Sequence, residues 1–569
     1  MVMHGGGFSI MQPKRPISGR CSGVVGGTWT PGSMAVADAA PAPLCPEIDS
    51  ATGFRHLLRP PGPDERCRLF IDPQQTGDSS EVRRTLSRLV KRMRTGFWPE
   101  GPARDNPAIP SGYTYLLQFM SHDLVQSSLA VSTDPRLGAV CDNLRHSQLR
   151  LATLYGGGPI VTPAIFAIDD PKLQTRARFR LGPMQSTGAA PAALRDIPRV
   201  AGALASGGAV RGLSEPLIAD PRNDDHALVS QLTVLFELVH NALVDLLPAS
   251  GDGFPEADAL HRFLCAREAC TQIYHNIIRH DVLPRLLQPK VHARYAAGTE
   301  AFLDQQGGGM PLEFSHAAFR IGHAMVRDNY VINTRAPAGE TLDDLLERTS
   351  SRAPGLMPLN ASWIVQWSKF FDLDSRPNLS QRIGPQFSGG LTSEALFPHV
   401  DETQELGLPY RDLVSGAAVA LWSVAGLMEE IRQRAPGLVD AAPLADAAAR
   451  AQAITSWLSQ PGAGGGLTPG QIDALASDPP LAFFVLFEAA TEADGTRLGT
   501  LGSIIVAEVM FQALGPDDGQ ALPARLEEAS TRYFGSNLLA AVPDIRDMSG
   551  LITFAAQSTG LNHAVPEFL

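Results

Sequence analysis

The sequence is poor in cysteine and lacks the cysteine spacings of metal sites. Its 569 residues include six cysteines, and none forms a CxxC pair or a Cys/His cluster. Cys265 and Cys270 are five residues apart on an expected helix, which places their side chains badly for a disulfide. We therefore expect no disulfide framework.

Basic residues are too few to favour a polyanionic partner. The chain has 47 Lys and Arg against 59 Asp and Glu, and its formal net charge is -12. This balance argues against nucleic acid or an anionic membrane as a partner. The apolar runs are too short to span a bilayer, and the first residues lack the apolar core of a secretory signal. We expect a cytoplasmic protein without a membrane span. Export without a cleaved leader stays open, and the oligomeric state is unknown.

Long alternating strands are also missing, and from Tyr113 onward the apolar residues recur at helical spacing. The strongest helix candidate is 223–247, which begins with an Asn/Asp cluster suited to capping and is then apolar on nearly every face. Three further inner helices are expected over 315–326, 415–434 and 501–514. The pattern predicts a mainly α protein.

The first part of the chain differs from the rest in composition. Residues 1–105 are rich in Gly, Pro and Ala, with short periodic pieces such as 80–95. We expect an irregular N-terminal arm over 1–105, packed on one large helical domain over 106–569.

Four stretches place His, Arg, Gln and Asp side chains in otherwise apolar segments. They are GYTYLLQFMSHDL (112–124), RLATLYGGGP (150–159), DPRNDDHALVSQLTVLFELVHN (220–241) and AAFRIGHAMV (317–326). In this order they resemble the animal-type haem peroxidases of the peroxidase–cyclooxygenase superfamily, especially the bacterial members. The first resembles the family's GYTYxGQFxDHDL, and the last resembles AFRxGHxxI. The resemblance implies a helical domain with haem between its central helices.

The resemblance also assigns roles on the two sides of the haem. His323 matches the proximal ligand of the haem iron, for which a neutral imidazole is required. On the distal side His122 matches the residue that acts as general base and then general acid on peroxide. Arg222 matches the cation that stabilises charge on the departing oxygen. Gln118 lies one helical turn before His122 and matches the distal glutamine that orders water or a small anion.

Two more residues are expected beside His323. Arg320 matches the family's propionate-binding arginine, and the dioxygenase branches have a radical-forming tyrosine at this position instead. Asp412 in GLPYRD stands where the family places the acceptor for the proximal imidazole, although Arg411 or solvent could equally pair with it.

The chain departs from the family at the covalent links to haem. Many relatives use two esters, from an Asp just before the distal His and a Glu three residues after the distal Arg. These positions are Ser121, which cannot form that ester, and Asp225, a shorter carboxylate. We expect haem b, or haem held by a single ester through Asp225.

The calcium segment of the family is also altered, and calcium is not expected. Asp123 is retained, but the later ligand positions include Arg150 and carry no carboxylate. A buried Asp123 without an ion needs another partner. We expect Arg150 to take the place of the ion, and the alternative is that Asp123 caps a local turn while Arg150 points to solvent.

The sequence thus predicts a haem peroxidase that reduces hydrogen peroxide and oxidises a small organic or halide donor. One alternative is a dioxygenase or peroxygenase acting on a fatty acid or another organic hydroperoxide. Another is a haem-binding protein of the same fold that has lost turnover.

Overall fold

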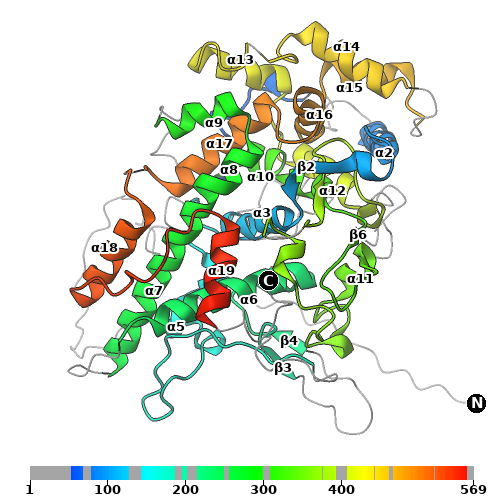
Figure 1. The fold of residues 1–569 in the computed structure, drawn as a ribbon. Coiled ribbons are helices and arrows are strands. Elements are labelled where there is room, and N and C mark those ends of the chain that lie inside the picture. The colour runs from blue at the N-terminus through cyan, green and yellow to red at the C-terminus, as the bar shows by residue number, and fades with distance from the viewer. Residues whose placement is uncertain are drawn as a thin grey trace, which may run out of the picture. The chain divides into compact units, whose positions relative to one another are not determined.

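Helices make up most of the residues that the computed structural model describes (Figure 1). The structure describes residues 53–67, 79–126, 143–185, 195–201, 214–248, 255–298, 308–373, 376–392, 407–440, 442–460, 466–517 and 519–559. All of these belong to one compact unit, Asp49–Leu569. The mainly α fold expected from the periodicity is confirmed.

The α-helices are α2 (Ser79–Thr95), α3 (Gly112–Leu124), α4 (Ala152–Tyr155), α5 (Gly158–Val161), α6 (Ala227–Asp245), α7 (Pro255–Ile277), α8 (Leu283–Leu286), α9 (Pro289–Ala296), α10 (Leu312–Ser315), α11 (Leu342–Glu347), α12 (Gly407–Ala418), α13 (Val424–Arg434), α14 (Ala447–Leu458), α15 (Pro469–Ser477), α16 (Leu481–Ala493), α17 (Thr500–Leu514), α18 (Leu522–Phe534) and α19 (Met548–Ser558). The 3-10 helices that matter for the site are η6 (Pro221–Asp224) and η8 (Ala318–Met325).

The strands of the described residues are short and form two-stranded pairs. Parallel β1 (Phe54–Arg55) and β5 (Met310–Pro311) make one pair. The antiparallel pairs are β2 (Asp105–Pro110) with β8 (Leu379–Gln381), β3 (Arg199–Ala201) with β4 (Ser214–Pro216), and β6 (Asn329–Tyr330) with β7 (Glu340–Thr341).

The core is built around α3 and α6, which pack against each other near the middle of the molecule (Figure 1). Phe119 of α3 stacks on Phe236 of α6, with ring centroids 5.1 Å apart and the planes 4° from parallel. Such a pair contributes about 0.5–1.5 kcal/mol beyond its buried area. Helix η8 packs against α3, and α16 and α17 pack against η8. The helix with the proximal candidate therefore lies between the core helices.

The start of α3 is fixed by a glycine. The Gly112 amide donates to the Phe370 carbonyl at 2.8 Å. A Cβ added at Gly112 would lie 2.5 Å from that oxygen and from the ring of Phe371. Only glycine therefore permits this close approach, which sets the position of α3 and of its polar side chains.

Helix α6 is long and apolar enough to cross a membrane by length and composition alone. In this structure 94% of its apolar window is buried inside the protein. It is a core helix here, as its all-round apolar surface predicts.

Three helix expectations need correction. The segment 315–326 was expected to be one α-helix, but it contains only the last residue of the short α10, followed by the 3-10 helix η8. The segment 415–434 is interrupted between α12 and α13, where Ala420 has a φ of 52°. Helix α6 is capped by His226, and the Asn/Asp cluster instead belongs to η6.

The expected arm is described only in part, because residues 1–52 and 68–78 lie outside the described ranges. Helix α2 matches the periodic piece 80–95 and packs against α12. Strand β1 pairs with β5 of the main domain. The division at residue 105 stays a prediction.

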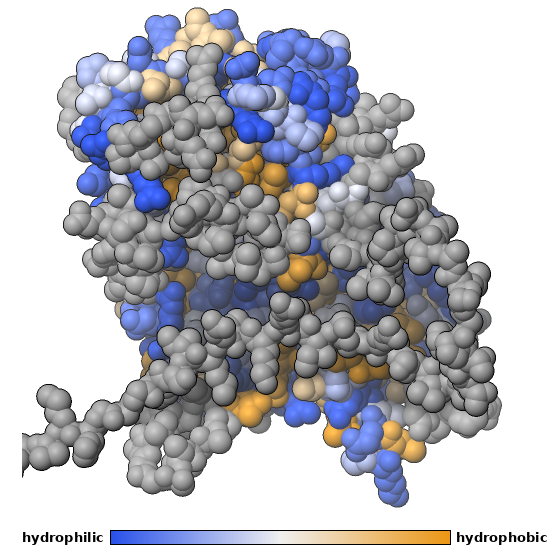
Figure 2. Space-filling model, turned by 180° about the vertical axis from the view of Figure 1, so that it is seen from behind, coloured by the Kyte–Doolittle hydropathy of each residue, from blue (hydrophilic) through white to orange (hydrophobic). Residues whose placement is uncertain are grey.

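The face turned away in Figure 1 shows hydrophobic residues in separate groups among hydrophilic ones (Figure 2). Large exposed apolar side chains of the described chain come from several segments, among them Leu144, Ile160, Val161 and Leu356. Such scattered exposure is ordinary for a protein surface.

Candidate active site

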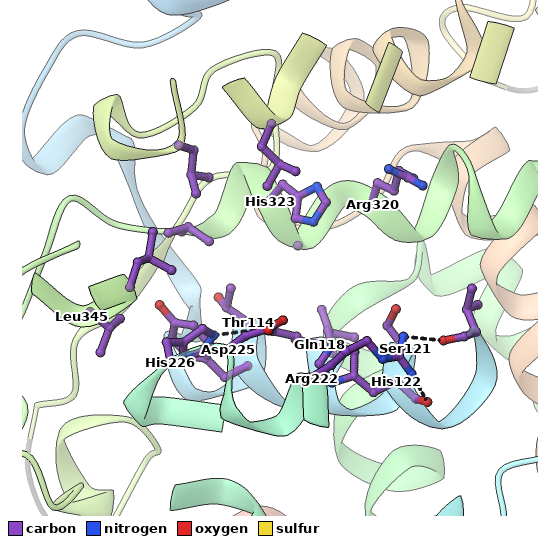
Figure 3. A pocket seen from close by; sticks show the side chains of 18 of the residues that line it. Thr114, Gln118, Ser121, His122, Arg222, Asp225, His226, Arg320, His323 and Leu345 are labelled. Carbon is purple, nitrogen blue, oxygen red and sulfur yellow. Dashed lines mark hydrogen bonds between the residues drawn. The ribbon is translucent and has the colours of Figure 1, made fainter. Parts of the chain in front are cut away.

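A cavity of about 740 Å³ lies between two walls from distant parts of the chain. One wall is α3 with the η6 turn, and η8 forms the opposite wall (Figure 3). Six of the seven predicted site residues line it: Gln118, His122, Arg222, Asp225, Arg320 and His323. Its apolar lining includes Leu117, Phe319, Val326, Leu342, Leu345, Leu346, Leu391 and Leu408. The structure thus brings the predicted residues together.

His122 is buried in the α3 wall, and one ring nitrogen has a fixed partner. Its Nδ1 lies 2.8 Å from Asn223 Oδ1. An amide oxygen only accepts, so Nδ1 carries the proton and Nε2 keeps its lone pair. Burial, helped by the charge of Arg222, lowers the pKa of His122 to about 4. At neutral pH the ring is therefore a neutral base at Nε2.

The orientation of the Asn223 amide is itself set by a neighbour. Its Nδ2 donates to Thr153 Oγ1 at 3.1 Å and to the Thr153 carbonyl at 3.3 Å. The Thr153 hydroxyl is 3.3 Å from Asp220 Oδ2, which can only accept. This chain of donors and acceptors runs from a carboxylate to His122. It holds the amide with its oxygen toward the imidazole.

Asp220 anchors this chain and binds two arginines. Its Oδ2 accepts from Arg145 Nη2 and from Arg222 Nη2, each at 2.6 Å, and its Oδ1 accepts from Arg222 Nε at 3.0 Å. Burial alone would raise the pKa of Asp220, but its hydrogen bonds and the charges of Arg222 and Arg145 hold it below the usual range. Asp220 is therefore a carboxylate despite being fully buried.

Arg222 is held rigidly at the cavity edge. Besides Asp220, its guanidinium donates to the His122 carbonyl at 2.9 Å and to the Val125 carbonyl at 2.6 Å. These carbonyls lie at the C-terminal end of α3, where a cation is favoured. Arg222 thus joins the η6 turn to the helix that carries His122.

Gln118 is hydrogen-bonded to a second histidine on the same wall. The Gln118 Oε1 lies 2.8 Å from His226 Nε2, and His226 Nδ1 accepts from the Val229 amide at 3.3 Å as the cap of α6. Burial, with the charges of His122 and Arg352, lowers the pKa of His226 to about 3. The cap histidine is therefore neutral.

His323 projects from η8 toward the opposite wall (Figure 3). Its Nδ1 lies 2.7 Å from Asp412 Oδ2, and Asp412 Oδ1 accepts from Arg320 Nη1 at 2.7 Å. Burial opposes ionisation of Asp412, but His323 and Arg320 lower its pKa below the usual value. The carboxylate therefore holds the Nδ1 proton and leaves the lone pair of Nε2 on the cavity side.

The sequence left open whether Asp412 pairs with His323, with Arg411 or with solvent. His323 and Arg320 are the donors that the structure places on its two oxygens. Arg320 also donates to the Ser315 carbonyl at 3.1 Å. Pairing of Arg320 with a haem propionate stays a prediction.

The two positions considered for covalent links both line the cavity (Figure 3). Ser121 lies on α3, and Asp225 follows η6. Asp225 is accessible from the cavity but surrounded by protein, and this burial raises its pKa to about 6. An ester through Asp225 stays a prediction.

The expected pairing of Asp123 with Arg150 is wrong. Arg150 is exposed and donates to Gln148 Oε1 at 2.8 Å. Asp123 instead accepts from the amides of Leu151 at 2.9 Å and Thr153 at 3.3 Å, at the start of α4. Burial raises the pKa of Asp123 to about 6, although these amides oppose the rise. The alternative of a local cap describes the structure.

Sequence reasoning missed the roles of Asn223, Asp220, Arg145 and His226. Asn223 gave no local signal, because its partner His122 is 101 positions away. His226 could have been found, since it directly precedes the apolar run and is the position where a cap is expected.

Comparisons with known proteins agree with the resemblance read from the motifs. Residues 206–372 match the model of the family described as animal haem peroxidase. No curated protein matches the chain.

Similar solved structures are Peroxidase A from Dictyostelium discoideum and fatty acid alpha-dioxygenases from Arabidopsis thaliana and Oryza sativa. The first is 14% identical, covers 83% of this chain and 89% of that one, and has a TM-score of 0.47. The Arabidopsis enzyme is 12% identical over 84% and 74% of the two chains, with a TM-score of 0.43. The Oryza enzyme is 11% identical over 85% and 78%, with a TM-score of 0.45. The family model thus supports an animal haem peroxidase domain over residues 206–372 of this chain.

Proposed function

We propose that this protein is a haem peroxidase that reduces hydrogen peroxide and oxidises a small organic or halide donor. The observation that supports this most directly is the pair of imidazoles on opposite walls of one cavity. His323 and His122 each have Nδ1 bonded to a protein oxygen, which leaves both Nε2 atoms free to accept. One imidazole suits a metal ligand and the other suits a proton acceptor.

The cavity suits a planar, mostly apolar macrocycle. Its volume of about 740 Å³ falls within the usual range of cofactor sites. At Gly322, beside His323, an added Cβ would meet no protein atom within 4 Å, so the glycine keeps this part of the wall flat. The leucines of the lining would supply apolar contact, and His323 with its Asp412 partner would hold the iron.

Bound haem supplies the redox-active iron at which peroxide is reduced by two electrons. His122 Nε2 would accept a proton from one peroxide oxygen and return it to the other as the O–O bond breaks. Its lowered pKa keeps it available for the first transfer above about pH 4. Arg222 contributes positive charge at the cavity edge, and its bonds to Asp220 fix it there without reorganisation.

The attachment of haem follows from the two positions described. We propose haem b, or haem with one ester through Asp225. Acid–organic extraction followed by mass spectrometry distinguishes free haem from the single link. Two links would contradict the proposal, because Ser121 has no carboxylate.

The test is an optical titration of the haem-loaded protein. One equivalent of hydrogen peroxide should change the spectrum, and a phenol, an aromatic amine or iodide should restore it. The His323→Ala variant should lose turnover, whereas His122→Gln should bind haem and react at least about a hundredfold more slowly with peroxide. A spectrum indifferent to peroxide would instead indicate a haem-binding protein without turnover.

A dioxygenase or peroxygenase acting on a fatty acid or organic hydroperoxide is the competing assignment. The arginine at position 320, where those branches have a tyrosine, opposes it. Oxygen uptake with a fatty acid and without peroxide turnover would favour it.

A further inference from the structure

The inference concerns His226, whose side chain links the cap of α6 to the distal cavity wall. The ring is buried and makes two hydrogen bonds, one with each nitrogen. Tyr115 also packs on it edge-to-face, with centroids 5.0 Å apart. The ring is therefore held in one orientation.

The Val229 amide decides which nitrogen of His226 carries the proton. A backbone N–H can only donate, so Nδ1 must accept and must be unprotonated. In a neutral ring the proton is then on Nε2, which faces Gln118. His226 therefore presents an N–H to Gln118.

The same reasoning continues to the side-chain amide. The partner of an N–H donor must be Oε1 of Gln118, not its NH2 group. The amide nitrogen of Gln118 then lies on the other branch of the carboxamide, and the residue lines the cavity (Figure 3). A flipped amide would oppose two donors and lose the bond.

We propose that His226 is a positioning residue that fixes the amide of Gln118 with its N–H donors toward the cavity. The cavity wall next to His122 is therefore a donor surface. It favours small ligands with lone pairs, such as fluoride, over ligands that must donate. This proposal rests on the proposed function, since the ligand would sit on the haem iron.

The variant His226→Ser separates positioning from folding. Serine is a good helix cap and can still accept from the Val229 amide, so α6 should stay capped. It is too short to reach Gln118, so the amide is released. Thermal unfolding of the variant should stay cooperative, with a lower midpoint because the buried ring and its contact with Tyr115 are lost.

The assay is fluoride binding to the ferric, haem-loaded protein. Loss of one oriented hydrogen bond should weaken fluoride about five- to tenfold in His226→Ser and shift the charge-transfer band of the complex. Gln118→Leu should give the same loss. The double variant should bind no more weakly than either single variant, because both remove one interaction.

Equal fluoride affinity in His226→Ser and wild type, or additive losses in the double variant, would overturn the proposal. A second measurement does not need haem. Nitrogen NMR of the histidines in the haem-free protein should show His226 neutral, with Nε2 protonated, from pH 5 to 8. A proton on Nδ1 would also overturn the proposal. Failure to bind haem would refute the proposed function alone and leave this test in force.

Discussion

Replacing Asp412 with asparagine should reverse the tautomer of His323. The carboxylate accepts from His323 Nδ1 and from Arg320 Nη1, both at 2.7 Å. A carboxamide has one oxygen and can accept well from only one of these donors. The guanidinium can only donate, whereas imidazole Nδ1 can also accept. The oxygen should therefore turn to Arg320, and the new NH2 group should donate to His323 Nδ1.

The consequence falls on the nitrogen that faces the cavity. With Nδ1 accepting, the ring proton moves to Nε2, which then has no lone pair for iron. A hydrogen bond to a charged group contributes about 1.5–3 kcal/mol, and this sets the preference for Arg320. At 1.36 kcal/mol per tenfold, haem binding should weaken about 10- to 100-fold.

The assay is a haem titration followed in the Soret region, with resonance Raman of the iron–histidine stretch in the reduced protein. The stretch should fall in frequency or vanish in Asp412→Asn. Adding Arg320→Leu removes the competing donor, so the double variant should regain the iron–histidine stretch. Wild-type haem affinity and an unchanged stretch in Asp412→Asn would refute the reasoning.

Three further predictions concern the distal wall. Asn223→Leu should leave haem affinity unchanged but slow the reaction with peroxide at least about tenfold in stopped flow, because His122 loses the acceptor that keeps its proton on Nδ1; a wild-type rate would contradict this. Arg145→Met should lower the free energy of unfolding by about 2 kcal/mol in urea, because buried Asp220 loses a charged hydrogen bond. The matched change Arg150→Met, at an exposed residue, should stay within about 0.5 kcal/mol, and equal effects of the two would refute the assignment. His122 has a folded pKa of about 4, below its unfolded value, so its neutral form stabilises the fold above pH 6.5 and this contribution is lost as pH falls toward 4. When the pH is lowered from 7 to 5, the haem-free wild type should therefore lose about 2 kcal/mol more free energy of unfolding than the haem-free His122→Gln variant. Equal losses in the two proteins would contradict the lowered pKa.

Local spacing predicted the helical class, whereas the resemblance of four motifs to a known family predicted most cavity residues. Gln118 and His122 are one turn apart and do share a wall. Arg320 and His323 are three residues apart on a 3-10 helix. Side chains at this spacing point in the same direction on a 3-10 helix, and nearly so on an α-helix. The two side chains therefore share one face of the helix, although the helix type was predicted wrongly.

The errors came from backbone turns that spacing does not encode. The Arg150 prediction assumed that its side chain lies where relatives place a calcium ligand. Leu151 instead adopts a φ of 52°, so the chain turns there and presents backbone amides to Asp123. The break near Ala420 is a second left-handed residue inside an apolar run. Neither residue is a glycine, so nothing in the sequence indicated a left-handed conformation at either position.

The two walls of the cavity have a consequence for how the protein matures. Gln118 and His122 leave the ribosome early, whereas the acceptor of His323 is Asp412, in a helix made much later. At the usual rate of synthesis the interval is roughly 15 to 60 s. A cofactor that needs both walls can be captured only after α12 has emerged, so loading follows translation of most of the chain. For the proposed haem, capture would therefore follow synthesis of both walls.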